Sequence, residues 1–113
     1  MSDCIFCRIA AGEISADIVH QDDLAVALRD LNPQAPTHIL VIPRRHVSSV
    51  AELGEGDEQM LLRLLSVATS LAREEGLDQG YRLVTNVGPD AGQTVHHLHL
   101  HLLGGRRMGW PPG

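Results

Sequence analysis

Towards the end of the chain, His97, His99 and His101 alternate with leucines. Side chains along a strand point alternately to its two faces, so this spacing predicts one face of imidazoles and an opposite face of leucines that packs on the core. A single exposed histidine usually belongs to a solvated polar face. Three in register, with no other polar residue among them, favour a face that meets a ligand or a substrate.

The spacing of the histidines distinguishes two kinds of ligand. Same-face residues of a strand lie about 6.6 Å apart, so His97 and His101 lie about 13 Å apart. Zinc needs its nitrogen ligands at roughly 2.0–2.1 Å, so two neighbouring histidines reach one ion but all three do not. An extended, charged substrate fits the row better, with each ring meeting a different atom. An imidazole with an ordinary pKa of ~6.5 is mostly neutral at pH 7, and its lone pair makes it a nucleophile.

Cys4 and Cys7 are the only cysteines of the chain. They are too close in sequence to cross-link the fold, and nothing indicates an oxidising compartment. A redox role of the thioredoxin type is disfavoured because no strand precedes the pair. The remaining alternatives are two half-buried cysteines in a helical turn and two ligands of a metal ion.

The elements that position these residues follow from the apolar pattern. One helix of about 18 residues is predicted from an N-cap at Asp57 to a stop at Gly76. Its apolar face consists of Leu61, Leu64, Leu65, Ala68, Leu71 and Ala72. Strands are predicted at 18–20, 25–28, 38–42, 81–87 and 95–103, a short helical turn at 5–11, loops at 32–36 and 88–94, and an irregular tail at 104–113. Strands on both sides of one dominant helix favour an α+β fold with a mainly antiparallel sheet.

The composition fits one domain over residues 1–113. With 113 residues there is no room for a second domain, and 3% aromatic residues predict an aliphatic core. The net charge of −5 argues against binding to nucleic acid, and the arginine pairs at 44–45 and 106–107 are too short to change this. No apolar run approaches the ~18 residues of a membrane span, and the first three residues lack the positive charge of a signal peptide. We therefore expect a cytoplasmic protein that binds neither nucleic acid nor membranes.

Several short segments form a set with a fixed order. The run at 97–103 matches the pattern His-φ-His-φ-His-φ-φ, in which φ is apolar. The others are Asp-Leu-Asn-Pro-Gln-Ala-Pro-Thr-His at 30–38, Ile-Pro-Arg-Arg-His at 42–46, Asn at 86, Gly-Gln-Thr at 92–94 and Trp-Pro-Pro-Gly at 110–113. Together they resemble the histidine triad family, and within it the Hint branch of nucleotide-binding proteins, over essentially the whole chain.

The resemblance implies a fold and an assembly. The fold would be a histidine-triad-like α+β domain with one long helix and one short N-terminal helix. Two copies would form a homodimer whose sheet extends across both subunits, and the tail at 104–113 would reach the partner subunit. The ligand would be a purine nucleotide, an AMP or GMP conjugate that is cleaved at its α-phosphorus.

The resemblance also assigns catalytic roles to the three histidines. His99 would be the nucleophile and form a nucleotidyl-histidine that water then hydrolyses. His101 would lie toward the phosphate oxygens and supply hydrogen bonds or a proton. His97 would be a further candidate to carry a proton to the leaving group, since an amine leaves poorly until it is protonated.

Other residues match nucleotide-binding positions of the family. Asp30 would accept hydrogen bonds from the ribose hydroxyls, with Leu31 beside it against the base. Trp110 would cross to the active site of the partner. The phosphate and the leaving group would be surrounded by Asn86, Gly92, Gln93 and Thr94. Thr94 stands where the family often has serine, so the hydroxyl is kept; without the resemblance, these loop residues would be ordinary turn residues.

Some members of the family bind zinc through such a cysteine pair and two histidines. Here the set would be Cys4, Cys7, His46 and His97, a closed tetrahedral site that ties the N-terminus to the sheet and takes no part in catalysis. A metal-bound His97 cannot also carry a proton on the same nitrogen. The leaving group would then take its proton from His101, from water or from the substrate itself.

The leading hypothesis for function is hydrolysis of adenosine or guanosine 5′-phosphoramidates to the monophosphate and an amine, with no cofactor required for catalysis. Hydrolysis of dinucleoside polyphosphates, or nucleotidyl transfer, is the second hypothesis. A dimeric nucleotide-binding scaffold without activity is the third. The intact triad counts against the scaffold, and the Trp-Pro-Pro-Gly ending favours the Hint branch.

Overall fold

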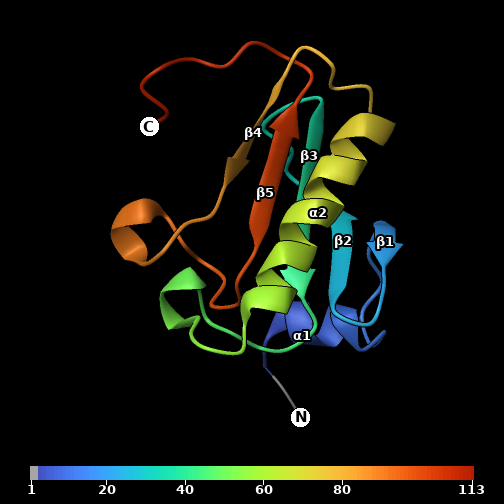
Figure 1. The fold of residues 1–113 in the computed structure, drawn as a ribbon, viewed down its shortest axis with the longest axis vertical. Coiled ribbons are helices and arrows are strands. Elements are labelled where there is room, and N and C mark those ends of the chain that lie inside the picture. The colour runs from blue at the N-terminus through green and yellow to red at the C-terminus, as the bar shows by residue number, and fades with distance from the viewer. Residues whose placement is uncertain (1–2) are drawn as a thin grey trace.

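A five-stranded antiparallel sheet forms the centre of the molecule, and a helix lies against each of its faces (Figure 1). The computed structural model describes residues 3–113. In chain order the elements are α1 (Ile5–Ala10), β1 (Ile18–Gln21), β2 (Ala25–Arg29), β3 (Thr37–Pro43), η1 (Val50–Glu52), α2 (Glu58–Glu74), β4 (Tyr81–Val84), η2 (Pro89–Ala91) and β5 (Leu100–Gly104). The strand order is β1-β2-β3-β5-β4. The predicted α+β class, with one long helix and one short N-terminal helix, is confirmed.

Two hydrophobic clusters hold the helices against the sheet. Side chains of β2 and β3 alternate between the clusters, so both faces of these strands are buried and their central residues, 25–28 and 39–42, are all apolar. The α2 side takes Ala25, Ala27, Ile39 and Val41, and the α1 side takes Val26, Leu28, Leu40 and Ile42. The α1 cluster includes Phe6 and Ile9 of that helix. Because α1 has only six residues, it covers part of its face of the sheet.

The long helix α2 lies where the leucine spacing predicts it, but its buried face is rotated. Met60 and Val67 are buried, whereas Leu61 and Leu65 lie at the flank and are about a third exposed. Asp57 is the N-cap by position, yet its carboxylate makes no cap hydrogen bond. It accepts instead from the Gly54 amide at 2.9 Å and pairs with the Arg45 guanidinium.

The last strand is shorter than predicted. β5 begins at Leu100, and the residues before it leave the ladder because the Leu98 amide donates to the Val47 carbonyl, with nitrogen and oxygen 2.6 Å apart. The predicted leucine face is nevertheless present, since Leu98, Leu100 and Leu102 are all buried in the α2 cluster. The strand predicted at 81–87 likewise ends early, at Val84.

Pairing of β5 with β3 sets the face of the remaining histidine. His101 lies opposite Leu40 in the antiparallel register, so both side chains point to the α1 face of the sheet. Among residues 3–113, no helix combines the length and the apolarity that crossing a membrane requires.

Candidate functional site

His99 lies just before β5, and its backbone environment fixes the position of its proton. The ring Nδ1 lies 2.7 Å from the carbonyl oxygen of His97, so Nδ1 carries the hydrogen and donates it. The carbonyl of His99 accepts a hydrogen bond from the Thr85 hydroxyl at 3.0 Å, which anchors the backbone there. In the neutral imidazole the lone pair is therefore on Nε2.

The Nε2 atom of His99 is open to reactants. It makes no hydrogen bond to any described residue, and the only fully buried side-chain nitrogen or oxygen without a partner in residues 3–113 is Nε of Arg8. Solvent therefore reaches His99 Nε2, although the residue as a whole is only 8% exposed. A buried ring with one exposed lone pair can act as a nucleophile.

A second chain of hydrogen bonds fixes the tautomer of His101. The backbone N–H of Gln34 donates to Nδ1 of His38 at 3.0 Å, which leaves the hydrogen of His38 on Nε2. That Nε2 lies 2.8 Å from Nδ1 of His101 and donates to it. His101 then carries its own hydrogen on Nε2, which faces solvent as a hydrogen-bond donor.

Burial keeps His101 neutral. Loss of solvation is the largest cause that lowers its pKa, the neighbouring His99 and His38 act in the same direction and only Asp30 opposes them, so that the pKa is about 4. Burial also lowers the pKa of His38, against a smaller opposing effect of Asp30. At neutral pH both rings are uncharged, so the row of hydrogen bonds from Gln34 through His38 to His101 carries no net charge.

Asp30 lies at the start of the loop after β2 and contacts this chain. Its Oδ1 accepts from the Asn32 amide at 2.8 Å, and its Oδ2 lies 3.4 Å from His38 Nε2. Asp30, His38 and His101 offer three metal-ligating atoms close together. In this structure His38 Nε2 and His101 Nδ1 bond directly to each other, so the three residues form a hydrogen-bonded chain. Next to Asp30, the side chain of Leu31 is 97% exposed.

The loop between β4 and β5 is held by Gln93. Its amide donates to the carbonyls of Ser48 and Val95 and accepts from the Gly88 amide, at 2.7, 3.1 and 2.9 Å. The Gln93 side chain is thus occupied by these three hydrogen bonds, one of which ties this loop to the loop after β3, so it holds the backbone in place. Gly92 ends η2 with a φ of +85°, which favours glycine. Thr94 is exposed and Asn86 is half-buried.

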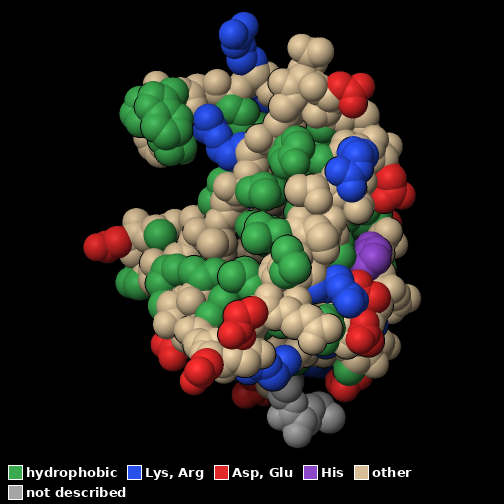
Figure 2. Space-filling view, viewed as in Figure 1, with side chains coloured by type: hydrophobic (Ala, Val, Ile, Leu, Met, Phe, Trp, Pro, Cys, Tyr) green, Lys and Arg blue, Asp and Glu red, His purple; other side chains and the backbone are tan. Residues whose placement is uncertain are grey.

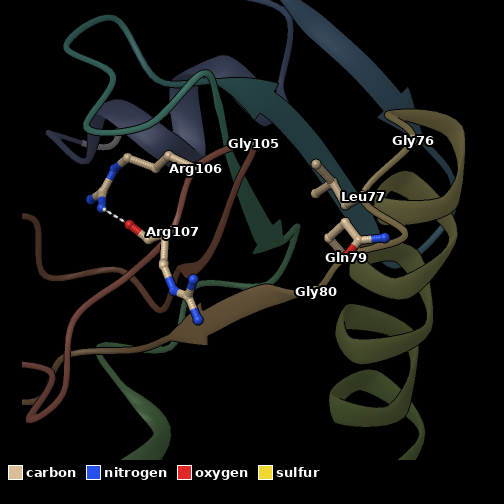
Figure 3. Close-up of a pocket in the computed structure, with 7 residues that line it drawn as sticks. All are labelled: Gly76, Leu77, Gln79, Gly80, Gly105, Arg106 and Arg107. Carbon is tan, nitrogen blue, oxygen red and sulfur yellow. Dashed lines mark hydrogen bonds between the residues drawn. The ribbon is translucent and has the colours of Figure 1, made fainter.

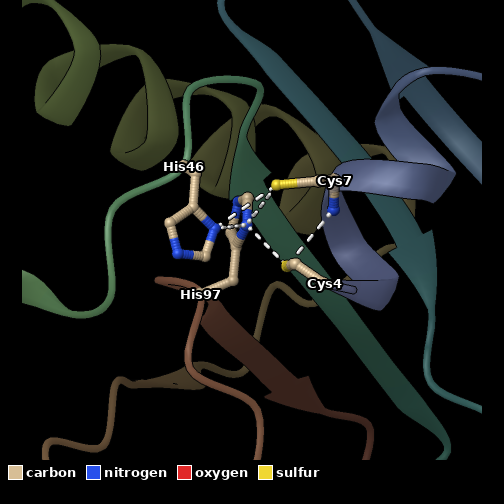
Figure 4. Close-up of side chains that lie close together, drawn as sticks. All are labelled: Cys4, Cys7, His46 and His97. Carbon is tan, nitrogen blue, oxygen red and sulfur yellow. Dashed lines mark hydrogen bonds between the residues drawn. The ribbon is translucent and has the colours of Figure 1, made fainter. Parts of the chain in front are cut away.

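Four ligand atoms of the kinds that zinc prefers meet beside α1 (Figure 4). His97 Nδ1 lies 3.2 Å from Cys4 Sγ, 3.5 Å from Cys7 Sγ and 3.2 Å from His46 Nδ1, and His46 Nδ1 lies 3.3 Å from Cys7 Sγ. Ligands at the corners of a tetrahedron around zinc are about 3.3–3.8 Å apart. The four residues therefore fit a tetrahedral metal site.

His97 is prepared for such a role by its second nitrogen. Nε2 donates to the carbonyl of Pro43 at 2.8 Å, which places the lone pair on Nδ1, facing the two sulfurs. Burial lowers the pKa of His97, so the ring is neutral, as a metal ligand must be. His97 is fully buried, so its ring does not face solvent, unlike the Nε2 atoms of His99 and His101.

The end of the C-terminal tail is exposed to solvent. Trp110 is 83% exposed, and the backbone beside it is held by a hydrogen bond from Arg82 to the Gly109 carbonyl at 2.9 Å. A cavity of about 540 Å³ lies near the start of this tail, between the turn after α2 and the residues after β5 (Figure 3). Of its lining residues, Arg106 donates to the carbonyls of Gln34 and Arg107, so it holds the backbone. None of the residues predicted for nucleotide or metal lines this cavity.

The structure adds two residues to those predicted for the site. His38 begins the strand predicted at 38–42, and a histidine at the edge of an aliphatic run is the signal that identifies it. Phe6 stands between Cys4 and Cys7, and its ring contacts both His97 and His99. No spacing rule points to Phe6, because these contacts join segments more than 90 residues apart.

Comparison with known proteins gives consistent results. The sequence pattern of the HIT domain matches residues 11–108. An uncharacterized HIT-like protein of Synechococcus elongatus is 52% identical over 98% of this chain and 97% of its own length. A 14 kDa zinc-binding protein of Zea mays is 48% identical over 99% of this chain and 89% of its own length.

Solved structures resemble the fold closely. The crystal structure of a HIT family hydrolase from Legionella pneumophila is 51% identical, covers 98% of this chain and 100% of that one, and has a TM-score of 0.96. A histidine triad nucleotide-binding protein from Candida albicans is 30% identical, with 96% and 83% of the two chains covered and a TM-score of 0.83.

Proposed function

The chain belongs to the HIT domain family and is a HIT family hydrolase, and from this premise we propose that it hydrolyses purine nucleoside 5′-phosphoramidates through a nucleotidyl-histidine on His99. The observation that carries the proposal is the solvent-facing lone pair of His99 Nε2, fixed by the hydrogen bond from Nδ1 to the His97 carbonyl.

In the first step, His99 Nε2 attacks the α-phosphorus. A nitrogen–phosphorus bond forms to His99 as the bond from phosphorus to the leaving amine breaks, and the electron pair of that bond goes to the amine. The imidazole keeps its Nδ1 hydrogen on the His97 carbonyl, so the adduct carries a positive charge on the ring and remains a good leaving group. No separate base is needed, because Nε2 has no hydrogen to lose.

His101 supports this step as a hydrogen-bond donor. With a pKa of about 4, only about one molecule in a thousand has His101 protonated at pH 7. Neutral His101 would become an anion if it gave up its Nε2 hydrogen, so it donates a hydrogen bond to a phosphate oxygen and keeps its proton. The proton that the amine needs then comes from water or from the substrate's own nitrogen.

In the second step, water attacks the phosphorus of the adduct. The bond to His99 Nε2 breaks, its electron pair returns to the imidazole, and the nucleoside monophosphate leaves. The proton released by water goes to solvent, so the enzyme returns to its starting state.

Nucleotide recognition is assigned to the loops around the sheet. Asp30 accepts from the ribose hydroxyls, and the exposed side chain of Leu31 packs on the base. The backbone from Gly92 to Thr94 and the Asn86 side chain surround the phosphate, while the Gln93 amide keeps that loop in shape.

We also propose that the four residues beside α1 bind zinc. The support is their tetrahedral spacing and the similarity to the zinc-binding protein of Zea mays. A bound zinc ion would cross-link α1 to the loop after β3 and to the segment before β5. The ligand nitrogen of His97 is then unavailable, so His97 is not a proton carrier for the leaving group.

The chain is proposed to act as a homodimer with a sheet that runs through both copies. β4 is the last strand of the sheet and, within the described chain, pairs only with β5. Exposed leucines occur on α2 at 61, 62 and 65, and Figure 2 shows hydrophobic side chains gathered on the face that carries α2. Trp110 would extend from this side toward the site of the partner.

The deciding experiment compares two substrates with the same protein. An adenosine 5′-phosphoramidate is expected to be hydrolysed at least tenfold faster, in kcat/KM, than a dinucleoside polyphosphate. Mass spectrometry of the quenched reaction is expected to find the nucleotidyl group on His99. A faster reaction with the dinucleotide would support the second hypothesis, and an adduct on another side chain would overturn the mechanism.

A further inference from the structure

The loop that follows Asp30 has no regular structure of its own. Within the described chain, residues 31–36 belong to no helix or strand, and the two prolines of this run, Pro33 and Pro36, have no backbone N–H to donate. The remaining backbone groups of such a loop take their hydrogen bonds from side chains or from water. The shape of the loop, and with it the direction of the Asp30 carboxylate, therefore depends on the side chains that bond to it.

Gln34 lies at the centre of this loop and is hydrogen-bonded through its side chain and through both backbone groups. Its side-chain amide donates to the Asn32 carbonyl at 3.0 Å, and its backbone N–H donates to His38 Nδ1 at 3.0 Å. Its carbonyl accepts from Nε of Arg106 at 3.1 Å. The backbone N–H of Asn32 in turn donates to Asp30 Oδ1 at 2.8 Å. A continuous row of contacts thus runs from the Arg106 guanidinium to the Asp30 carboxylate.

The pairing of β3 with β5 brings Arg106 to this loop. Thr37, the first residue of β3, lies opposite Gly104, the last residue of β5, so the chain after β5 starts beside the loop that precedes β3. Gly105 lies so close to Pro36 that a Cβ atom on it would be 2.9 Å from the Pro36 Cβ. Because Gly105 has no side chain and a φ of +91°, the next residue can reach the loop.

We propose that Arg106 is a positioning residue for ribose recognition, acting through Gln34 on the Asp30 carboxylate. The guanidinium is itself held by a second hydrogen bond, from Nη1 to the Arg107 carbonyl at 3.1 Å (Figure 3). It therefore fixes the Gln34 carbonyl, and Asp30 keeps the direction that its bond to Asn32 gives it. A carboxylate held in this way loses less freedom when it binds the adjacent 2′ and 3′ hydroxyls of a sugar, so the binding of ribonucleotides is strengthened selectively.

This inference rests on the proposed function, because it assumes that Asp30 accepts from the sugar hydroxyls. Its test compares AMP with 2′,3′-dideoxy-AMP, which has the same base and phosphate but neither hydroxyl. Calorimetry with the wild type is expected to show AMP bound at least about tenfold more tightly, because the analogue loses two hydrogen bonds to a charged group. In Asp30→Ala, the two affinities are expected to lie within about twofold of each other.

Arg106→Met tests the positioning role directly. It keeps most of the length of the side chain and removes its donors, and because Arg106 is exposed, the melting temperature is expected to stay near that of the wild type. AMP is expected to bind about fivefold more weakly, the effect of one hydrogen bond, whereas the affinity for 2′,3′-dideoxy-AMP is expected to change by less than about twofold. A merely structural role would not distinguish these two ligands.

Two further variants are the controls. Arg107→Met removes the same charge from the next residue, which is also exposed, and it leaves in place the backbone carbonyl that accepts from Arg106. It is expected to leave both affinities within about twofold of wild type. Asp30→Ala combined with Arg106→Met is expected to bind AMP as Asp30→Ala alone does, because Arg106 acts through the carboxylate that is already absent.

The outcomes separate the two proposals. Absence of AMP binding, or equal affinities of the wild type for AMP and 2′,3′-dideoxy-AMP, would overturn the proposed sugar contact on which this inference depends. A preference for AMP that is the same in the wild type and in Arg106→Met would overturn the role of Arg106 alone. Equal weakening of both ligands in Arg106→Met, or the same loss of preference in Arg107→Met, would show a general effect on the site or an effect of charge. Either result would also overturn the role of Arg106.

Discussion

Hydrogen bonds to the backbone decide what each imidazole of the site can do. His99 donates from Nδ1 to the His97 carbonyl, His97 donates from Nε2 to the Pro43 carbonyl, and His38 accepts at Nδ1 from the backbone N–H of Gln34. Each bond fixes whether one ring nitrogen carries a hydrogen, and so determines whether the other nitrogen is a donor or an acceptor. Chemically identical side chains thereby become suited to the three different roles that we propose for them, a nucleophile, a metal ligand and a hydrogen-bond relay.

Replacing the nucleophile should separate binding from catalysis. In His99→Ala, hydrolysis of an adenosine phosphoramidate is expected to fall at least about a thousandfold, whereas AMP binding is expected to persist. His96→Ala is the control, because His96 is exposed and close in sequence. Residual turnover within tenfold of wild type would exclude His99 as the residue that carries the adduct.

Acid should destabilise the fold partly through His101. Its pKa is about 4 in the folded protein and ~6.5 in the unfolded chain, so the unfolded chain binds more protons between these values. The contribution of neutral His101 to the free energy of unfolding is therefore fully present above about pH 6.5, and it decreases as the pH falls toward 4. The urea concentration at the midpoint of unfolding is expected to decrease from pH 7 to pH 5 in the wild type, and to decrease less in His101→Gln.

The control for this titration is His96→Gln, at an exposed position. Burial also lowers the pKa values of His38 and His97. Part of the pH dependence of the unfolding midpoint therefore remains in the His101 variant. An identical slope in wild type and in His101→Gln would show that His101 is not the group responsible.

At the scale of elements, periodicity predicts faces better than it predicts hydrogen bonding. The alternation at 97–103 correctly places the leucines under α2, yet only 100–104 form the strand. The pattern of side chains contains no information on whether the Leu98 amide bonds to a neighbouring strand or to the loop carbonyl at Val47. The burial of His97 and its approach to Cys4 likewise depend on contacts between distant segments, so the sequence predicts this metal site only through the family resemblance.

Removing both cysteines should lower the stability of the attachment of α1 more than it lowers the rate of hydrolysis. Cys4→Ser with Cys7→Ser is expected to abolish stoichiometric zinc binding and to lower the melting temperature, because α1 loses its attachment to the loop after β3. Hydrolysis is expected to stay within tenfold of wild type, a barrier change below about 1.4 kcal/mol.

Metal analysis, thermal unfolding and steady-state kinetics on the same preparation check this expectation. Complete loss of hydrolysis in a folded, zinc-free double variant would mean that the metal takes part in the reaction.

For the whole molecule, the central question is whether one active site needs two chains. Trp110 is 83% exposed, and the tail that carries it is fixed to the rest of the chain at Gly109 by Arg82. An indole exposed to this extent gains little from its own subunit. A place in the site of the partner would account for its exposure and agrees with the proposed homodimer.

A mixture of two inactive or weakened variants can test this arrangement. His99→Ala lacks the nucleophile, and Trp110→Ala is expected to fold normally but to have a lower kcat/KM. After subunit exchange, half of the dimers are mixed, and each has one site with both His99 and the Trp110 of the other chain. Activity is expected to rise to about a quarter of wild type.

The size of the molecule in solution gives the control, since sedimentation should show a dimer for each variant and for the mixture. If the activity of the mixture equals the mean of the two separate proteins, Trp110 serves its own subunit or has no role in the site.

Strand β5 has a hydrogen-bonded neighbour on each side, β3 and β4, whereas the residues proposed for recognition lie on surface loops and on the tail. The residues proposed for the reaction therefore lie on different segments from those proposed to select the substrate, so that the two sets can change independently in evolution. Insertions or exchanges around Leu31, or in the tail after Gly104, can alter which base or amine is accepted without moving the acting imidazoles. Chimeras that receive these two segments from a relative should therefore inherit the relative's preference while retaining their own reaction mechanism.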